Sequence, residues 1–149
     1  MDKQKLQEEL KQSMLAKNEL KTSVLRLLLS AINYYEIQKG GAGYQATVDD
    51  ILSVIQTQVK QRKDSIEQFT TAGRQELVDK ETKELEILKT YLPQQMEEDE
   101  VKTIVEQTVK ETGATTITDM GKVMGALGPK LKGKADMGLV SQLVKEKLS

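Results

Sequence analysis

The amino-acid sequence predicts an all-α protein, with an N-terminal bundle of about four helices and a C-terminal three-helix domain. Apolar residues recur at three- or four-residue spacing through nearly the whole chain. Aromatic residues make up only 3 %, so aliphatic side chains must form the core, which favours helical packing over a β-sandwich. The 149 residues are enough for one ordinary domain or two small ones.

The first part of the chain contains four helical patterns. Gly40 to Gly43 interrupts them as an expected flexible connector, and Thr47 is an expected N-cap for the third helix. The expected helices cover residues 2–16, 19–38, 48–72 and 75–91. In the first helix, Leu6, Leu10 and Met14 share a face, and the second has a stripe that is expected to be buried: Leu20, Val24, Leu27, Leu28, Ala31, Ile32 and Tyr35.

Pro93 marks the expected boundary between two domains, residues 1–93 and 94–149. Proline disfavours an α conformation at the preceding Leu92, so the fourth helix must end there. Three further helices are expected at 97–111, at 118–127 and after Asp136, a good N-cap. Gly128-Pro129 is expected to end the second of these three.

Composition excludes several kinds of chemistry. The chain has no cysteine and no histidine, which rules out disulfides, thiolate metal sites and an imidazole base. No catalytic residue, metal site or cofactor is therefore predicted. The longest apolar run, Leu27 to Leu29, is too short to cross a bilayer, and no apolar signal core follows Met1. A cytoplasmic location is expected, or an equivalent compartment if a targeting peptide has been removed.

Charge is distributed unevenly although the net charge is only −1. Residues 1–93 carry 14 basic and 14 acidic side chains. Residues 94–111 have two lysines against six acids, and residues 112–149 have six lysines against three acids. A charged partner responds to such local fields rather than to the net charge, so the basic end of the chain is a candidate binding region.

The segment from Gly121 to Lys134 is rich in glycine and lysine. Gly121 and Gly125 share a helical face, which suggests close backbone approach, either to another helix or to phosphates of a ligand. Residues 128–134 nearly match the P-loop pattern G-x-x-x-x-G-K. We reject a P-loop because Ala135 lacks the magnesium-binding hydroxyl, no strand precedes the segment, and Pro129 removes a backbone donor.

Lysines in this segment are candidates for contacts with a phosphate backbone. Lys130, Lys132 and Lys134 are expected on one short loop, with Lys122 one helix away. Lysines spaced in this way can contact successive phosphates, which gives salt-sensitive binding that is largely independent of base sequence. The alternative interpretation is a solvated surface loop.

A second basic cluster, Lys60, Arg62 and Lys63, is predicted on the third helix. Lys60 and Lys63 fall on the face opposite the apolar stripe and could contact RNA. The alternative is a solvated helix face with intrahelical pairs such as Lys63 to Glu67. Tyr34 is a further candidate, because an exposed tyrosine can stack on a base.

Three motifs together resemble the Yqey-like family over essentially the whole chain: the segment 121–134, Tyr91-Leu92-Pro93, and residues 61–67 (QRKDSIE). That family is similar in turn to the C-terminal tail of the B subunit of the glutamine-dependent aspartyl/glutamyl-tRNA amidotransferase. The resemblance implies two helical domains and tRNA as the ligand. It does not imply catalysis by this chain itself, because the chemistry of the amidotransferase lies in other domains of that enzyme. The amidotransferase is a carbon–nitrogen ligase with glutamine as amido-N-donor.

Ten positions match the family pattern: Gly121, Val123, Met124, Leu127, Lys130, Lys132, Gly133, Lys134, Ala135 and Asp136. Three positions depart from it. Glu97 replaces a helix-capping serine, which should weaken that helix start; Gly128 replaces a larger apolar residue; and Met137-Gly138 removes one plausible contact. Two functions follow: a non-catalytic tRNA-binding accessory module, or a protein-interaction module that docks on a larger tRNA-handling enzyme. Neither involves a membrane or DNA.

Overall fold

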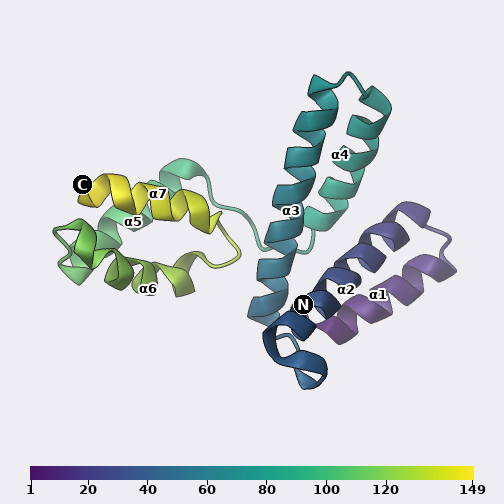
Figure 1. Cartoon of the computed structure of the whole chain (residues 1–149), viewed down its shortest axis with the longest axis horizontal. Helices are drawn as coiled ribbons and strands as arrows, with labels where there is room; N and C mark the ends of the chain where they lie inside the picture. Colours follow the sequence, from purple (N-terminus) through teal and green to yellow (C-terminus); the bar gives the residue numbers. More distant parts are fainter. The chain divides into compact units, whose positions relative to one another are not determined.

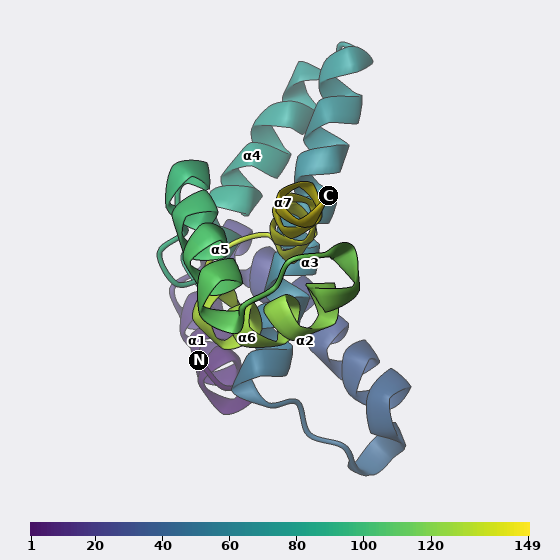
Figure 2. The ribbon, with the colours of Figure 1, turned by 90° about the vertical axis from the view of Figure 1, so that its left-hand side faces the viewer.

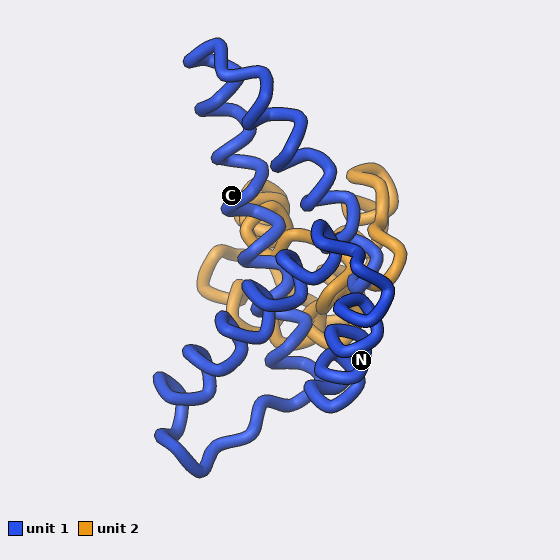
Figure 3. The backbone as a smooth tube through the Cα atoms, turned by 90° about the vertical axis from the view of Figure 1, so that its right-hand side faces the viewer, with its two compact units in different colours: residues 1–92 blue, residues 93–149 orange.

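The computed structural model describes residues 1–149 and confirms the all-α prediction, with seven α-helices, two short 3₁₀ turns and no strand. The chain forms two compact units, Met1–Leu92 (unit 1) and Pro93–Ser149 (unit 2), which are coloured separately in Figure 3. No helix combines the length and the hydrophobicity that crossing a membrane requires.

Unit 1 consists of two helical hairpins (Figure 1). Helices α1 (Lys3–Leu15) and α2 (Glu19–Gly40) form the first, and α3 (Val48–Thr71) and α4 (Gln75–Lys89) form the second. Helix α2 also contacts α3 and α4, and this contact joins the hairpins. The hydrophobic cluster of unit 1 consists of aliphatic side chains and one tyrosine: Leu6, Val24, Leu25, Leu28, Leu29, Ile32, Ile51, Val54, Ile55, Val59, Leu85, Leu88 and Tyr91.

A hydrogen-bonded network around Asp50 fixes the connection between α2 and α3. Residues Gly41–Gly43 form a 3₁₀ turn, and Tyr44 returns the chain toward α3. The hydroxyls of Tyr44 and Tyr35 donate to the Asp50 carboxylate at 2.6 and 2.9 Å, and the backbone N–H of Thr47 donates to it at 3.0 Å. The Thr47 hydroxyl caps α3 by accepting from the Asp50 N–H, as its position in the sequence predicts.

Unit 2 is a three-helix domain of α5 (Glu98–Thr112), α6 (Met120–Leu131) and α7 (Met137–Leu148), in which each helix contacts the other two. Helix α7 is seen nearly end-on in Figure 2. A 3₁₀ turn, η2 (Ile117–Asp119), leads into α6. The core contains no aromatic side chain: Val101, Val105, Val109, Val123, Leu127, Leu131, Ala135, Val140, Leu143, Val144 and Leu148.

Helix α6 continues past Pro129, which the sequence analysis expects to end it. Proline cannot donate to the carbonyl of Gly125, so one helical hydrogen bond is lost. The extra turn is nevertheless stable because Leu131 is completely buried, a contribution of about 2 kcal/mol for a leucine. The Lys132 N–H closes the helix by donating to the Gly128 carbonyl at 2.9 Å.

Two residues assigned to apolar faces lie largely in solvent instead. Leu27 is 51 % exposed and Met14 is 50 % exposed. Periodicity alone cannot distinguish them from core positions, because both residues keep the three- or four-residue apolar spacing of their helices. Helix α5 also differs from expectation: Glu100 accepts from the Glu97 N–H at 3.1 Å, so the start of the helix is capped without a serine.

Candidate nucleic-acid interface

The C-terminal end of α6 positions the three lysines that the sequence groups together. Because α6 extends to Leu131, Lys130 lies on its last turn rather than on a loop. Lys132 follows as the C-cap, and Gly133 then takes a left-handed conformation with φ of 76°. Only glycine adopts this conformation without strain, so Gly133 is required for the turn that leads to Lys134.

Residues 131–135 alternate between buried and exposed positions. Leu131, Gly133 and Ala135 point inward, whereas Lys132 and Lys134 are exposed. The segment is also held by its backbone: the Met96 N–H donates to the Lys134 carbonyl at 2.9 Å, and the Gln95 amide donates to the Gly133 carbonyl at 2.6 Å. The two lysines are therefore displayed by an anchored backbone, which reduces the entropy lost when they bind a partner.

Lys130 makes contacts within unit 2. Its ammonium group lies 3.1 Å from a Glu111 carboxylate oxygen and donates to the Thr108 hydroxyl at 3.2 Å. A phosphate that binds Lys130 must compete with Glu111, so Lys130 is a weaker candidate for phosphate contact than its position in the cluster indicates.

Lys122 lies in the first turn of α6, eight residues before Lys130, or roughly 12 Å along the helix. It is exposed and close to Asp119. The backbone N–H groups of Thr115 and Thr116 donate to the Asp119 carboxylate and hold its pKa below the usual value, and Lys122 adds to this effect. The sequence therefore places lysines at both ends of α6.

Gly121 and Gly125 do not mark a close helix contact. A methyl group added at either position would meet no atom within 4 Å other than the helix's own backbone. Close helix packing is thus the wrong explanation for these glycines. The second explanation, approach of a ligand's backbone to this open face of α6, stays a hypothesis.

The basic cluster on α3 separates into one structural residue and two exposed ones. Arg62 is buried and forms ion pairs with Glu81, at 3.0 Å, and with Glu84 on α4. Lys60 and Lys63 are exposed and form no ion pair or hydrogen bond within the protein. The two lysines can bind an external anion without first losing an internal partner.

The candidate lysines thus fall into two groups, Lys60 and Lys63 in unit 1 and Lys122, Lys130, Lys132 and Lys134 in unit 2. No group of three or more histidine, cysteine, aspartate or glutamate side chains is arranged to hold a metal ion.

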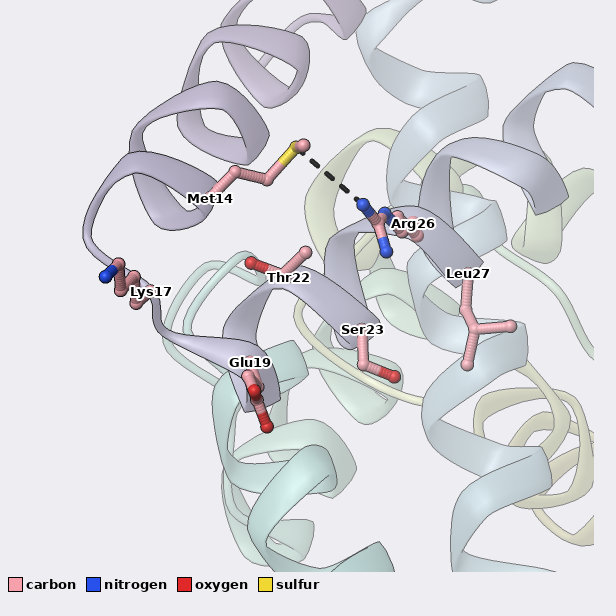
Figure 4. A pocket seen from close by; sticks show the side chains of 7 residues that line it. All are labelled: Met14, Lys17, Glu19, Thr22, Ser23, Arg26 and Leu27. Atoms are coloured by element: carbon pink, nitrogen blue, oxygen red, sulfur yellow. Dashed lines mark hydrogen bonds between the residues drawn. The ribbon is translucent and has the colours of Figure 1, made fainter.

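The turn between α1 and α2 forms a surface that the sequence analysis did not identify. A cavity of about 730 Å³ is lined there by the side chains shown in Figure 4: Met14, Lys17, Glu19, Thr22, Ser23, Arg26 and Leu27. Arg26 directs its guanidinium toward the Met14 sulfur, 3.9 Å away, and makes no ion pair. In the sequence, this surface could have been identified from the charged residues Lys17, Glu19 and Arg26, which lie between the apolar residues Met14 and Leu27.

This geometry defines a class of protein: all-α, with two helical units and lysines that face outward. Residues 3–148 match the family described as Yqey-like protein. The chain belongs to that family, which confirms the resemblance drawn from the sequence.

Curated relatives share part of this chain. Proteins named "Altered inheritance of mitochondria protein 41, mitochondrial" are 41 % identical over 90 residues in Lachancea thermotolerans, 40 % over 90 residues in Saccharomyces cerevisiae, and 39 % over 88 residues in Vanderwaltozyma polyspora. The matches cover 60, 60 and 58 % of this chain, and 46, 47 and 46 % of those proteins. The chain thus matches less than half the length of these relatives.

The predicted cytoplasmic location is contradicted by this comparison. The relatives are named as mitochondrial proteins, and the mitochondrion is a different compartment from the one predicted for this chain. The lack of an apolar signal core after Met1 does not distinguish the two compartments.

Proposed function

We propose that this protein is a tRNA-binding accessory module with no catalytic centre of its own, associated by family with glutamine-dependent tRNA amidotransferases. The observation that carries the proposal is the set of exposed lysines on fixed backbone. Lys60 and Lys63 have no partner within the protein, and Lys132 and Lys134 point outward from an anchored segment. The resemblance to the amidotransferase tail supplies tRNA as the ligand.

Physical chemistry gives the expected mode of binding. Lysine ammonium groups neutralise backbone phosphates and release condensed counterions, so affinity falls as salt rises. Such contacts position a nucleic acid without reading its sequence. The module would therefore hold a tRNA body, while a separate enzyme carries out chemistry on the attached amino acid.

Fluorescence anisotropy with labelled tRNA tests this function. K60E/K63E and K132E/K134E should each weaken binding at least tenfold at 100 mM salt and flatten the dependence of affinity on salt. The matched control is K80E/K83E, because Lys80 and Lys83 are exposed on α4 and the change in net charge is the same. Equal tRNA affinity for all three variants and the wild type would refute the proposed interface.

The second candidate function is a protein-interaction module that docks on a larger tRNA-handling enzyme. The surface around the α1–α2 turn favours it, because Leu15 is 70 % exposed and Leu27 and Met14 are about half exposed; Met14 lines one hollow with Leu15 and another with Leu27. Exposed apolar side chains that cluster on a surface mark interaction sites. A partner recovered by affinity purification that resists nuclease and is lost with L15E/L27E would favour this function over direct tRNA binding.

A further inference from the structure

A groove between α2 and α3 combines an aromatic surface with uncharged polar side chains. Its volume is about 530 Å³, within the range of sites that hold small organic groups. Ala31 and Val54 contribute apolar lining, and Tyr34 adds an aromatic ring that is 66 % exposed. Both helices belong to unit 1, so the groove is part of one compact body.

The groove has no charged side chain in its lining, unlike the cavity at the α1–α2 turn, which contains Lys17, Glu19 and Arg26. A lining without charge gives no Coulomb attraction to an ion and favours a neutral group. A flat neutral group matches best, because Tyr34 offers an aromatic ring and is a strongly exposed residue of this lining.

Three glutamines, Gln38, Gln58 and Gln61, supply amides along the groove. An amide offers both a donor and an acceptor, which is the combination that pairs with the edge of a nucleobase. Gln58 donates to Gln61 at 3.5 Å, a long hydrogen bond that a ligand can replace at little cost. The Gln38 side chain makes no hydrogen bond within the protein.

Neighbouring side chains fix the wall of the groove. The Tyr35 hydroxyl donates to Asp50 at 2.9 Å, and the Lys39 ammonium lies 5.6 Å from the Tyr35 ring centroid. Tyr35 is therefore held in place, whereas Tyr34 projects beyond it into solvent. Lys60 directly precedes Gln61 on α3 and is exposed.

We propose that this groove binds an unstacked nucleobase of RNA. The base stacks on Tyr34, the glutamine amides contact its edge, and Lys60 binds a phosphate of the same strand. Unpaired RNA bases are commonly recognised by this combination of aromatic stacking and edge hydrogen bonds. The inference rests on the proposed RNA-binding function and adds to it a contact that is made with a base rather than with the backbone.

Two labelled oligomers of equal length and charge test the groove, a single-stranded RNA and an abasic ribose-phosphate chain. The wild type should bind the RNA more tightly than the abasic chain. Y34A should lower RNA affinity about tenfold, which corresponds to about 1.4 kcal/mol, and should leave abasic binding unchanged. Y34F should retain the wild-type affinity because the ring remains. I37A is the matched control, since Ile37 is an exposed apolar residue of α2 outside the groove.

The outcomes separate this inference from the function on which it rests. Equal binding of both oligomers by wild type and Y34A would overturn the base groove and leave backbone binding intact. If neither oligomer binds, both proposals fail. Adenosine alone should bind no more tightly than millimolar, and a monomer that competes as well as the RNA would instead make the groove a site for free nucleosides. Circular dichroism verifies that Y34A stays folded.

Discussion

In unit 1, charged side chains lie between the helices, whereas the interior of unit 2 is almost wholly aliphatic. Glu36, Asp50, Arg62 and Glu84 are all buried in unit 1. The only buried polar side chain in unit 2 is that of Thr108. Some charged side chains of unit 1 therefore stabilise the fold from buried positions, whereas the ionised side chains of unit 2 lie at its surface. Counting charges along the chain overestimates the binding capacity of the first region more than that of the second.

The largest loss of stability is expected from the buried ion pair of unit 1 formed by Arg62 and Glu84, whose side chains are 9 and 4 % exposed. E84A leaves the Arg62 guanidinium buried with only the peripheral Glu81 as partner. Uncompensated buried charge makes this the largest expected loss, about 3 kcal/mol of unfolding free energy. Urea unfolding followed by tyrosine fluorescence measures it, because all four tyrosines lie in unit 1.

The double variant R62M/E84L is the control for that loss. It removes both charges and fills the space, so its stability should lie close to that of the wild type. The exposed pair Arg74–Glu76 provides a second control, and E76A should cause no measurable change. If the unfolding free energy of R62M/E84L is as low as that of E84A, helix packing rather than the buried charge dominates at this position.

The next effect concerns Asp50 and depends on pH. The hydroxyl of Tyr44 and then the Thr47 N–H lower the pKa of the Asp50 carboxyl well below its usual range. Because the folded pKa lies below the unfolded value of about 3.9, the stabilisation is complete above roughly pH 5 and is lost as pH falls. D50N should lose about 2 kcal/mol at pH 7 and a smaller amount at pH 2.5, where the carboxyl is already protonated in the unfolded chain but still ionised in the folded protein. A loss of equal size at both pH values would contradict this account.

The helices were predictable because local residues determine where a helix begins and ends. Whether a charged side chain forms an ion pair depends on packing between helices, which local sequence does not show. Thr47 and Asp136 cap helices as their positions predict. By contrast, the helical spacing puts Arg62 on the apolar stripe, three residues after Val59 and four before Ile66, but its acidic partners are fixed only by the packing of α4 against α3. Local rules also place the end of α6 too early, because the burial of Leu131 outweighs the cost of Pro129.

The same limit applies to the candidate site. The lysines were identified by their residue type and clustering, but the pairing of Lys130 with Glu111 depends on the packing of α6 against α5. The groove beside Tyr34 needs residues from two helices, so a single-helix pattern could identify only the tyrosine.

The next prediction concerns the stability of unit 2 and the uncovered face of α6 that carries Gly121 and Gly125. G125A adds a methyl group that meets no atom within 4 Å, so the variant should gain up to about 1 kcal/mol from helix propensity. Amide hydrogen exchange of Leu127 measures the gain, because unit 2 has no aromatic reporter. G113A is the contrasting control in the same unit, since Gly113 has φ of 68° and alanine is strained there. If G125A is more stable but binds tRNA more weakly, the ligand backbone approaches this face of α6.

The smallest expected effect is that of the exposed pair Lys130–Glu111, whose side chains are 43 and 54 % exposed. K130A should change the stability of unit 2 by less than about 0.5 kcal/mol, because solvent screens such pairs. Its effect on tRNA affinity should also be smaller than that of K134A, since phosphate binding at Lys130 must displace Glu111. E111Q separates the two contributions: it releases Lys130, so tRNA affinity should rise slightly in the wild-type background and stay unchanged in K130A. An equal rise in both backgrounds would mean that Glu111 repels the tRNA directly, and Lys130 would then be a structural residue rather than part of the interface.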